Sequence, residues 1–358
     1  MANKIKVDLG LDSYKISMID SFVSSISHVA SSTKSQCMLI SQDNIYKLYK
    51  DKFDQLSKLS NISIHLIDDG EQAKSFETIT QITNKMASEH FDRSSIVLAV
   101  GGGVVGDIAG FAASVYMRGI DYVQYPTTLL AMVDSSIGGK TGINLKSGKN
   151  LVGRIYQPKA VEIDINFLLT LPDRQINAAL AEAIKYGFIY DRELFDFIAS
   201  SIDNIIENKS IKILEKIIIQ CCEIKSDVVS EDVNENELRM ILNFGHTVGH
   251  AIEGYFDYRT LLHGEAIFYG MKCALYLSNK YGNLSNNEYN KSLDLLSKFD
   301  LPSVSIEDYD KFMTYIKSDK KIRASNVKFI LLDEIGKSQI NDNISFEQIK
   351  ESLKVLWK

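Results

Sequence analysis

Short apolar runs alternate with amphipathic stretches along the first half of this chain. The run at 94–102 is almost continuously apolar and ends in glycines, which is typical of a strand buried on both faces. Helical patterns separate several of the runs, and this alternation of strand and helix predicts an α/β domain with a mainly parallel sheet. The expected strands are 37–41, 62–68, 94–102, 121–128 and 160–165.

The pattern changes after Pro172, where long helix-forming segments take over. Beyond this point the chain contains a single proline, Pro302, which suits a helical second domain. We therefore expect an α/β domain over 1–172 and an α-helical domain over 173–358. The expected elements of the second domain are helices at 175–188, 191–207, 209–229, 238–254 and 264–281, and a late hairpin at 328–340 that turns at Gly336.

The segment 238–254 carries a polar stripe. Arg239, Asn243, His246 and His250 follow one another at spacings of four, three and four, which would place them on one face of an α-helix. Their neighbours are apolar, and a buried polar stripe is costly unless each member has a partner. A metal ion and an anionic ligand would supply such partners, and the spacing suggests His246 and His250 as the metal-binding pair. The alternative is a core histidine pair that is satisfied by backbone carbonyls.

A glycine-rich turn at 100–107 follows an expected strand and opens an expected helix. Gly101, Gly103 and Gly106 fit the pattern G-x-G-x-x-G, in which the backbone approaches a pyrophosphate at a helix N-terminus. This context favours a Rossmann-like nucleotide site, although glycine turns also end strands that bind nothing. Asp107 comes too early in the chain to be the acidic residue that usually binds the ribose.

The following segment, 126–153, is dense in small residues and includes Lys140 and Lys149. Its GGKTG core lacks the full phosphate-loop spacing because Ser135 stands where the first glycine belongs, so we reject an ATPase. Backbone donors and lysines in this number favour phosphate binding. The alternative is a flexible surface loop.

A carboxylate and a third histidine complete the candidate metal ligands. Glu182 and Lys185 are three residues apart among alanines and isoleucines, which indicates either a helical ion pair or a buried carboxylate on a metal. His263 lies at an expected helix start. One carboxylate and two histidines can bind a zinc-like ion and leave positions open for a substrate.

Composition narrows the class of protein. A net charge of −6 argues against nucleic-acid binding. The four cysteines form no C-x-x-C pair and no disulfide framework. The N-terminal segment lacks an apolar signal core, and the low-charge stretch 96–117 is broken by polar residues and glycines, so a strand and a helix fit better than a membrane span. We expect a cytoplasmic enzyme.

In order along the chain, the motifs GGGVVGDIAGFAAS, MRGIDYVQYPTTLLAMVDSSIGGKTGIN, GKNLVG, LPDR, AEAIKYG, LRMILNFGHTVGHAIE and LHGEA resemble the 3-dehydroquinate synthase family of sugar-phosphate cyclases. The resemblance implies an NAD- and metal-dependent enzyme of the shikimate pathway. Such an enzyme converts 3-deoxy-D-arabino-heptulosonate 7-phosphate to 3-dehydroquinate and phosphate, with no net redox change. It also implies NAD between the two domains and a homodimer with Arg118 near the interface.

The resemblance also assigns roles to residues. It implies that Zn²⁺ or Co²⁺ is bound by Glu182, His246 and His263, so that His250 becomes an acid/base residue at the substrate and Glu235 a proton acceptor. Implied NAD contacts are Glu71, Lys74, Gly102, Gly103, Val104, Asp107, Thr127, Thr128, Lys140, Lys149, Thr170 and Leu171. Implied substrate contacts are Arg118, Asp134, Lys140, Asn150, Lys185, Lys225, Arg239, Asn243 and either Lys320 or Lys321.

The chain departs from the family pattern in places. Val233 and Asn234 stand between Asp232 and Glu235, where the family has an acidic and a basic residue. Ala179 and Leu180 stand where the family commonly has glycine before the metal-binding glutamate, and Gln42 replaces an acidic residue expected at the ribose. The alternatives are another sugar-phosphate cyclase, a metal-dependent polyol dehydrogenase, and a catalytically inactive nucleotide-binding regulator.

Overall fold

The computed structural model describes residues 4–33, 35–232, 238–318, 322–323 and 326–357. The chain divides into two compact units. One contains Met1–Leu171 and Lys225–Val233, and the other contains Pro172–Ile224 and Asn234–Lys358. No helix in the described residues is long and apolar enough to cross a membrane.

The first unit is built on a seven-stranded sheet with the order β1-β2-β9-β6-β5-β3-β4. Its neighbouring strands are parallel except for the pair β1 and β2. All five expected strands are present, which confirms the mainly parallel sheet. The strands are β1 (Lys4–Val7), β2 (Tyr14–Ile19), β3 (Cys37–Gln42), β4 (Ile62–Ile67), β5 (Ile96–Gly101), β6 (Asp121–Pro126) and β9 (Ala160–Asp164).

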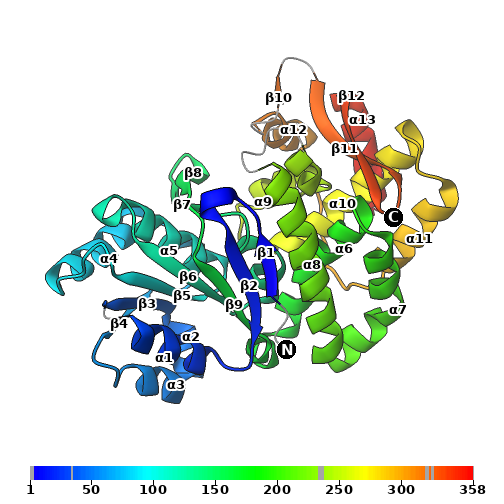
Figure 1. Cartoon of the computed structure of the whole chain (residues 1–358). Helices are drawn as coiled ribbons and strands as arrows, with labels where there is room; N and C mark the ends of the chain where they lie inside the picture. The colour runs from blue at the N-terminus through cyan, green and yellow to red at the C-terminus, as the bar shows by residue number, and fades with distance from the viewer. Residues whose placement is uncertain (1–3, 34, 233–237, 319–321, 324–325, 358) are drawn as a thin grey trace. The chain divides into compact units, whose positions relative to one another are not determined.

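Helices cover both faces of this sheet. Figure 1 shows α4 and α5 on one face and α1, α2 and α3 on the other. The apolar core under α4 and α5 includes Met38, Val97 and Ile108, and burying each such side chain contributes about 1.5–3 kcal/mol. The helices of this unit are α1 (Phe22–Ser32), α2 (Asp43–Leu48), α3 (Lys50–Leu56), α4 (Phe76–Ser88) and α5 (Gly103–Val115), with short helices η1 (Gly10–Asp12), η2 (Glu71–Ala73), η3 (Tyr116–Arg118), η4 (Ala131–Ser135) and η5 (Ile165–Leu169).

Part of the segment 126–153 forms an antiparallel hairpin, β7 (Lys140–Leu145) and β8 (Gly148–Ile155). The alternative of a flexible loop is therefore wrong over these residues. The two strands approach so closely that a Cβ on Gly153 would lie 2.1 Å from the carbonyl oxygen of Thr141. Glycine usually weakens a strand. The glycines that allow the two strands to lie this close are therefore also the reason why the sequence did not predict them as strands.

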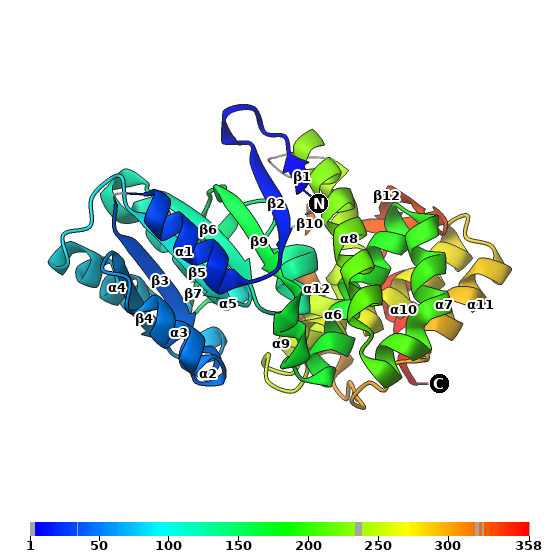
Figure 2. The ribbon, with the colours of Figure 1, turned by 60° about the horizontal axis from the view of Figure 1, so that its bottom comes forward.

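The second unit is mainly helical. Figure 2 shows α6, α7, α10 and α11 of this unit, and α10 packs against α6, α9, α11 and β11. Helix α8 begins here, but its residues from Lys225 onward belong to the first unit. The helices are α6 (Asp173–Ile189), α7 (Arg192–Asn208), α8 (Ile211–Glu231), α9 (His246–Tyr255), α10 (His263–Tyr281), α11 (Asn286–Leu296), α12 (Tyr309–Ser318) and α13 (Phe346–Ser352), with short helices η6 (Leu238–Asn243) and η7 (Leu353–Trp357).

A small antiparallel sheet completes the second unit, with the order β10-β11-β12. Strands β11 (Asn326–Glu334) and β12 (Lys337–Ile344) form the late hairpin, and β10 (Ile322–Arg323) pairs with β11. Gly336 has φ of 90° in the turn, a conformation that glycine adopts without steric cost. The predicted hairpin and its turn residue are confirmed.

The expected single helix at 238–254 is wrong. The segment forms the 3₁₀ helix η6, and a new helix, α9, begins at His246 after Gly245 has turned the chain with φ of 77°. A Cβ on Gly245 would lie 2.8 Å from the backbone nitrogen of Met271 on α10, so close packing fixes this glycine. Arg239 and Asn243 therefore do not share one α-helical face with His246 and His250.

Candidate metal and nucleotide sites

Three histidines of the second unit gather at one point. His246 opens α9, His250 follows one turn later, and His263 opens α10. One nitrogen from each ring lies within 4.8 Å of the others, a spacing that suits ligands around one metal ion. The close crossing of α9 and α10 makes this possible, because a Cβ on Gly270 of α10 would lie 1.9 Å from the carbonyl oxygen of Gly245.

Glu182 of α6 lies against this histidine cluster and is fully buried. Its Oε1 is 3.3 Å from His246 Nε2 and 3.6 Å from His263 Nε2. Its Oε2 accepts a hydrogen bond from Lys185, but no hydrogen bond within the described part of the chain reaches Oε1. A buried carboxylate oxygen that accepts no hydrogen bond of good geometry, at ion-pair distance from two imidazole nitrogens, fits a divalent cation of the zinc type.

The electrostatics of the cluster favour positive charge. Burial opposes ionisation of Glu182, but Lys185 and His246 outweigh it and hold the pKa of this carboxyl well below its usual value. Burial also disfavours charging of His263, yet Glu182 and Glu253 raise the pKa of His263 to about 10. The same negative surroundings that hold a proton on this ring would hold a metal cation in its place.

Glu253 of α9 is a member of this site that sequence reasoning missed. Its Oε2 lies 3.1 Å from His263 Nδ1, and the residue is buried. A carboxylate on Nδ1 fixes the ring so that Nε2 faces the metal position, a common arrangement behind metal-binding histidines. The available signal was its spacing, because Glu253 follows His246 by seven residues and returns to the same face of the helix.

The first unit brings together a second set of the predicted residues. Lys74 Nζ lies 2.6 Å from Asp107 Oδ2 and 3.5 Å from Glu71 Oε1, and it donates to the side chain of Asn150. Asn144 links them further, because its Nδ2 donates to Glu71 Oε1 at 2.9 Å and its Oδ1 accepts from the Asn150 backbone at 2.8 Å. Asn144 lies within the segment 126–153 but received no predicted role.

A cavity of about 290 Å³ lies beside this cluster, and Asp107, Lys140 and Asn150 help to line it. Burial raises the pKa of Asp107 to about 6, although Lys74 and Lys140 act to lower it. The cavity therefore presents a lysine, an arginine (Arg154) and an amide together with a carboxyl group that is only weakly acidic. This combination suits a ligand that carries phosphate groups.

The glycine turn has the expected arrangement of strand, glycine and helix, because β5 ends at Gly101 and α5 begins at Gly103. A Cβ on Gly103 would lie 2.9 Å from Ser135 Oγ, and one on Gly102 would lie 3.1 Å from Thr128 Cγ2. Thr127 donates its backbone N–H to Gly101 at 3.0 Å. The glycines, both threonines and the start of α5 therefore lie together, with backbone N–H groups available to an anion.

The remaining predicted residues are spread over both units. Lys225 Nζ donates to Asp134 Oδ1 and to its backbone oxygen, each at 2.6 Å, within the first unit. Arg239 is buried in η6, and Asn243 donates to the backbone of Met240. Lys149 lies in β8, and Arg118 is the last residue of η3, with φ of 70°. The hydroxyl groups of Thr170 and Tyr49 form a hydrogen bond, and Leu171 is the residue after Thr170. Glu235, Lys320 and Lys321 lie outside the described residues.

Comparison with known proteins identifies the family. Residues 64–178 match the 3-dehydroquinate synthase N-terminal family model, and residues 179–322 match the C-terminal one. The chain belongs to the 3-dehydroquinate synthase family. It is 45% identical to the 3-dehydroquinate synthase of Dictyoglomus thermophilum over 88% of each chain. It is 42% identical to that of Thermodesulfovibrio yellowstonii over 98% of this chain and 99% of the relative.

Solved structures place this synthase family within a wider fold. A crystal structure of 2-deoxy-scyllo-inosose synthase, complexed with carbaglucose-6-phosphate, NAD⁺ and Co²⁺, has a TM-score of 0.88 and covers 99% of both chains at 29% identity. A probable glycerol dehydrogenase from Sinorhizobium meliloti has a TM-score of 0.61 at 14% identity over 95% of both chains, a likeness that shows the fold alone.

Proposed function

We propose that this chain is a 3-dehydroquinate synthase that converts 3-deoxy-D-arabino-heptulosonate 7-phosphate to 3-dehydroquinate and phosphate, with NAD and a divalent metal ion. One observation carries the chemistry: the buried Oε1 of Glu182 lies at ion-pair distance from the Nε2 atoms of both His246 and His263, and among the described residues it accepts no hydrogen bond of good geometry. Membership of the family and 45% identity to a named synthase support the substrate.

The residues of each unit then take separate tasks. Glu182, His246 and His263 would hold the metal, with Glu253 fixing the ring of His263. The N-terminus of α5 and the residues around Lys74 would hold NAD. When bound, the metal would polarise the reacting oxygen, and NAD would accept and return a hydride. The relative complexed with NAD⁺ and Co²⁺ supports both cofactors.

Substrate binding rests on cationic and amide side chains. Lys140 and Asn150 line the cavity of the first unit and would hold the phosphate. Lys225, which donates to Asp134, and the buried Arg239 would hold oxygens of the substrate, including its carboxylate. His250, within reach of the other two histidines, would transfer a proton at a substrate oxygen.

Phosphate release tests this function directly. The parent protein, supplied with NAD and Zn²⁺, should release phosphate from the heptulosonate 7-phosphate far faster than from other sugar phosphates. NADH should not accumulate in proportion to product, because the hydride returns within each turnover. Stoichiometric NADH would replace the proposal with a polyol dehydrogenase, whereas preference for a non-carboxylated sugar phosphate would replace it with another cyclase.

We also propose a homodimer in the cytoplasm, with Arg118 supplied near the interface. Met117 and Arg118 have φ of 48° and 70°, and such left-handed residues cost of order 1–3 kcal/mol unless their surroundings hold them. Met117 and Val115 are also exposed apolar side chains in the same segment. Light scattering at micromolar concentration should give twice the chain mass, and a monomer would reject this assembly.

A further inference from the structure

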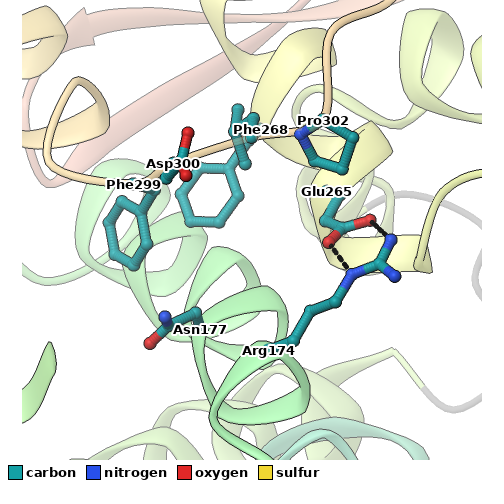
Figure 3. A pocket seen from close by; sticks show the side chains of 8 residues that line it. Arg174, Asn177, Glu265, Phe268, Phe299, Asp300 and Pro302 are labelled. Carbon is teal, nitrogen blue, oxygen red and sulfur yellow. Dashed lines mark hydrogen bonds and ion pairs between the residues drawn. The ribbon is translucent and has the colours of Figure 1, made fainter.

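The last residue of the LPDR motif has no role in the function proposed above, yet it makes a two-point ion pair in the second unit. Arg174 Nε donates to Glu265 Oε1 at 2.7 Å, and its NH2 donates to Glu265 Oε2 at 2.9 Å. Figure 3 shows the two side chains face to face beside a cavity of about 400 Å³. A paired, planar contact of this kind fixes orientation as well as distance.

This ion pair joins the two elements that carry metal ligands. Arg174 lies in the first turn of α6, about two turns before Glu182. Glu265 lies two residues after His263 in the first turn of α10. The contact therefore ties the helix that carries the carboxylate ligand to the start of the helix that carries a histidine ligand.

Glu265 also fixes the backbone just before α10. Its Oε2 accepts the backbone N–H of Leu262 at 2.8 Å, which satisfies a donor at the helix start. The NH2 group of Arg174 reaches the carbonyl oxygen of Thr260 at 3.3 Å. The guanidinium therefore holds both the capping carboxylate and the segment that leads into His263.

Close backbone packing sets the distance between the start of α10 and α6. A Cβ on Gly264 would lie 1.7 Å from the carbonyl oxygen of Ala178, so the start of α10 rests directly on the backbone of α6. This contact fixes how near the start of α10 lies to α6. The ion pair between Arg174 and Glu265 adds a directional restraint at the same place, beside the packing of α10 against α6 and α9.

We propose that Arg174 is a positioning residue for the metal site: through Glu265 it sets the position of His263 relative to Glu182. This inference rests on the proposed metal site and adds a residue that touches neither metal nor substrate. Side chains behind metal ligands typically change metal affinity by roughly 10–100-fold when removed.

The test measures Zn²⁺ affinity of the full-length protein by competition with a chromogenic chelator. Arg174→Ala should weaken Zn²⁺ binding about tenfold, and Arg174→Lys should fall between this variant and the parent, because lysine keeps the charge but loses the planar fork. The Co²⁺-loaded Arg174→Ala protein should also show an altered visible absorption spectrum, which reports ligand geometry.

Arg192→Ala is the matched control. Arg192 is likewise a partly exposed arginine near the start of a helix, paired with a largely buried carboxylate, Glu288. The Arg192→Ala variant should leave Zn²⁺ affinity and the Co²⁺ spectrum unchanged.

The Arg174→Ala variant should still fold. The cavity beside Glu265 lets water solvate this carboxylate when the guanidinium of Arg174 is removed, which limits the loss of folding stability.

Each outcome has a distinct meaning. Arg174→Ala with parental affinity and spectrum would overturn the role of Arg174, and so would an equal loss in Arg192→Ala. If Arg174→Ala does not fold, Arg174→Lys decides, because parental affinity there would also overturn the role. A parent protein that binds no Zn²⁺ would reject the proposed function itself.

Discussion

The Nδ1 atom of His263 lies 3.1 Å from a carboxylate oxygen of Glu253, while its Nε2 faces Glu182 at 3.6 Å. The imidazole is thus held between two carboxylates, one behind it and one at the candidate metal position. This relationship gives the ring a single useful orientation, because a flipped ring would exchange the two nitrogens.

The carboxylate behind His263 should therefore affect metal binding without touching the metal. Glu253→Gln keeps the side-chain size but removes the charge, and we expect Zn²⁺ affinity to fall roughly tenfold, measured by chelator competition. Glu351→Gln is the control, since Glu351 is a partly exposed glutamate of α13 that accepts hydrogen bonds from Tyr276 and Tyr281. Equal affinities in parent and Glu253→Gln would show that the carboxylate does not orient the ring.

Removing the proposed metal ligand His263 should reduce metal binding more than removing the charge of Glu253 behind it. His263→Ala leaves Glu182 with one histidine partner from the proposed set, so metal and activity should be lost together. Elemental analysis of the purified variant measures the metal, and phosphate release measures the activity. Full metal occupancy in this variant would refute the assignment of His263 as a ligand.

The glycine at the start of α5 should be required for two separable reasons. Gly103→Ala places a Cβ 2.9 Å from Ser135 Oγ, so the hydroxyl must turn aside, and we expect the free energy of unfolding to fall by about 0.5–1.5 kcal/mol. It should also weaken NAD binding, because the added methyl group blocks close approach to the backbone.

The double variant Gly103→Ala/Ser135→Ala separates these effects. Removing the hydroxyl relieves the contact, so thermal stability should recover towards that of Ser135→Ala alone while NAD affinity, measured by calorimetry, stays low. Recovery of parental NAD affinity in the double variant would mean that the glycine serves packing and not the cofactor.

The partly buried carboxyl of Asp107 should make stability depend on pH. Burial raises its pKa from 3.8 to about 6, so the folded state binds this proton more tightly than the unfolded state does. Its contribution is therefore most favourable below about pH 4 and is lost as pH rises through about 6. Asp107→Asn mimics the protonated form, so its melting temperature relative to the parent should rise between pH 5 and pH 8. A constant difference would show that Asp107 has an ordinary pKa.

The sequence predicted those elements well whose structure is determined by their own residues. The five expected strands of the first unit are short apolar runs bounded by glycine or polar residues, so each could be predicted from its own residues. The break at Gly245 depends instead on Met271, which is 26 residues away in the chain and packs against it. The helical spacing around it suggested one continuous helix, and tertiary packing overrode that pattern.

The candidate site shows the same limit. The family resemblance named Glu182, His246 and His263, and the structure brings these residues together. Glu253 was missed because a single glutamate on a helix usually reads as a solvated residue, and only the fold shows that His263 lies opposite it. Asn144 received no predicted role because its hydrogen bonds to Glu71 and Asn150 depend on the β7–β8 hairpin, whose glycines weaken the strand pattern in the sequence.

The return of residues 225–233 to the first unit makes that unit discontinuous in sequence. Ser226 donates to the backbone of Lys6, Ser230 accepts from Asp8, and Lys225 holds Asp134, all within this unit. A gene fragment cut after Leu171 would therefore omit a piece of the unit it was meant to isolate. During synthesis, too, the first unit stays incomplete until the ribosome has added more than fifty further residues, so its final packing is a late event although most of its chain is early.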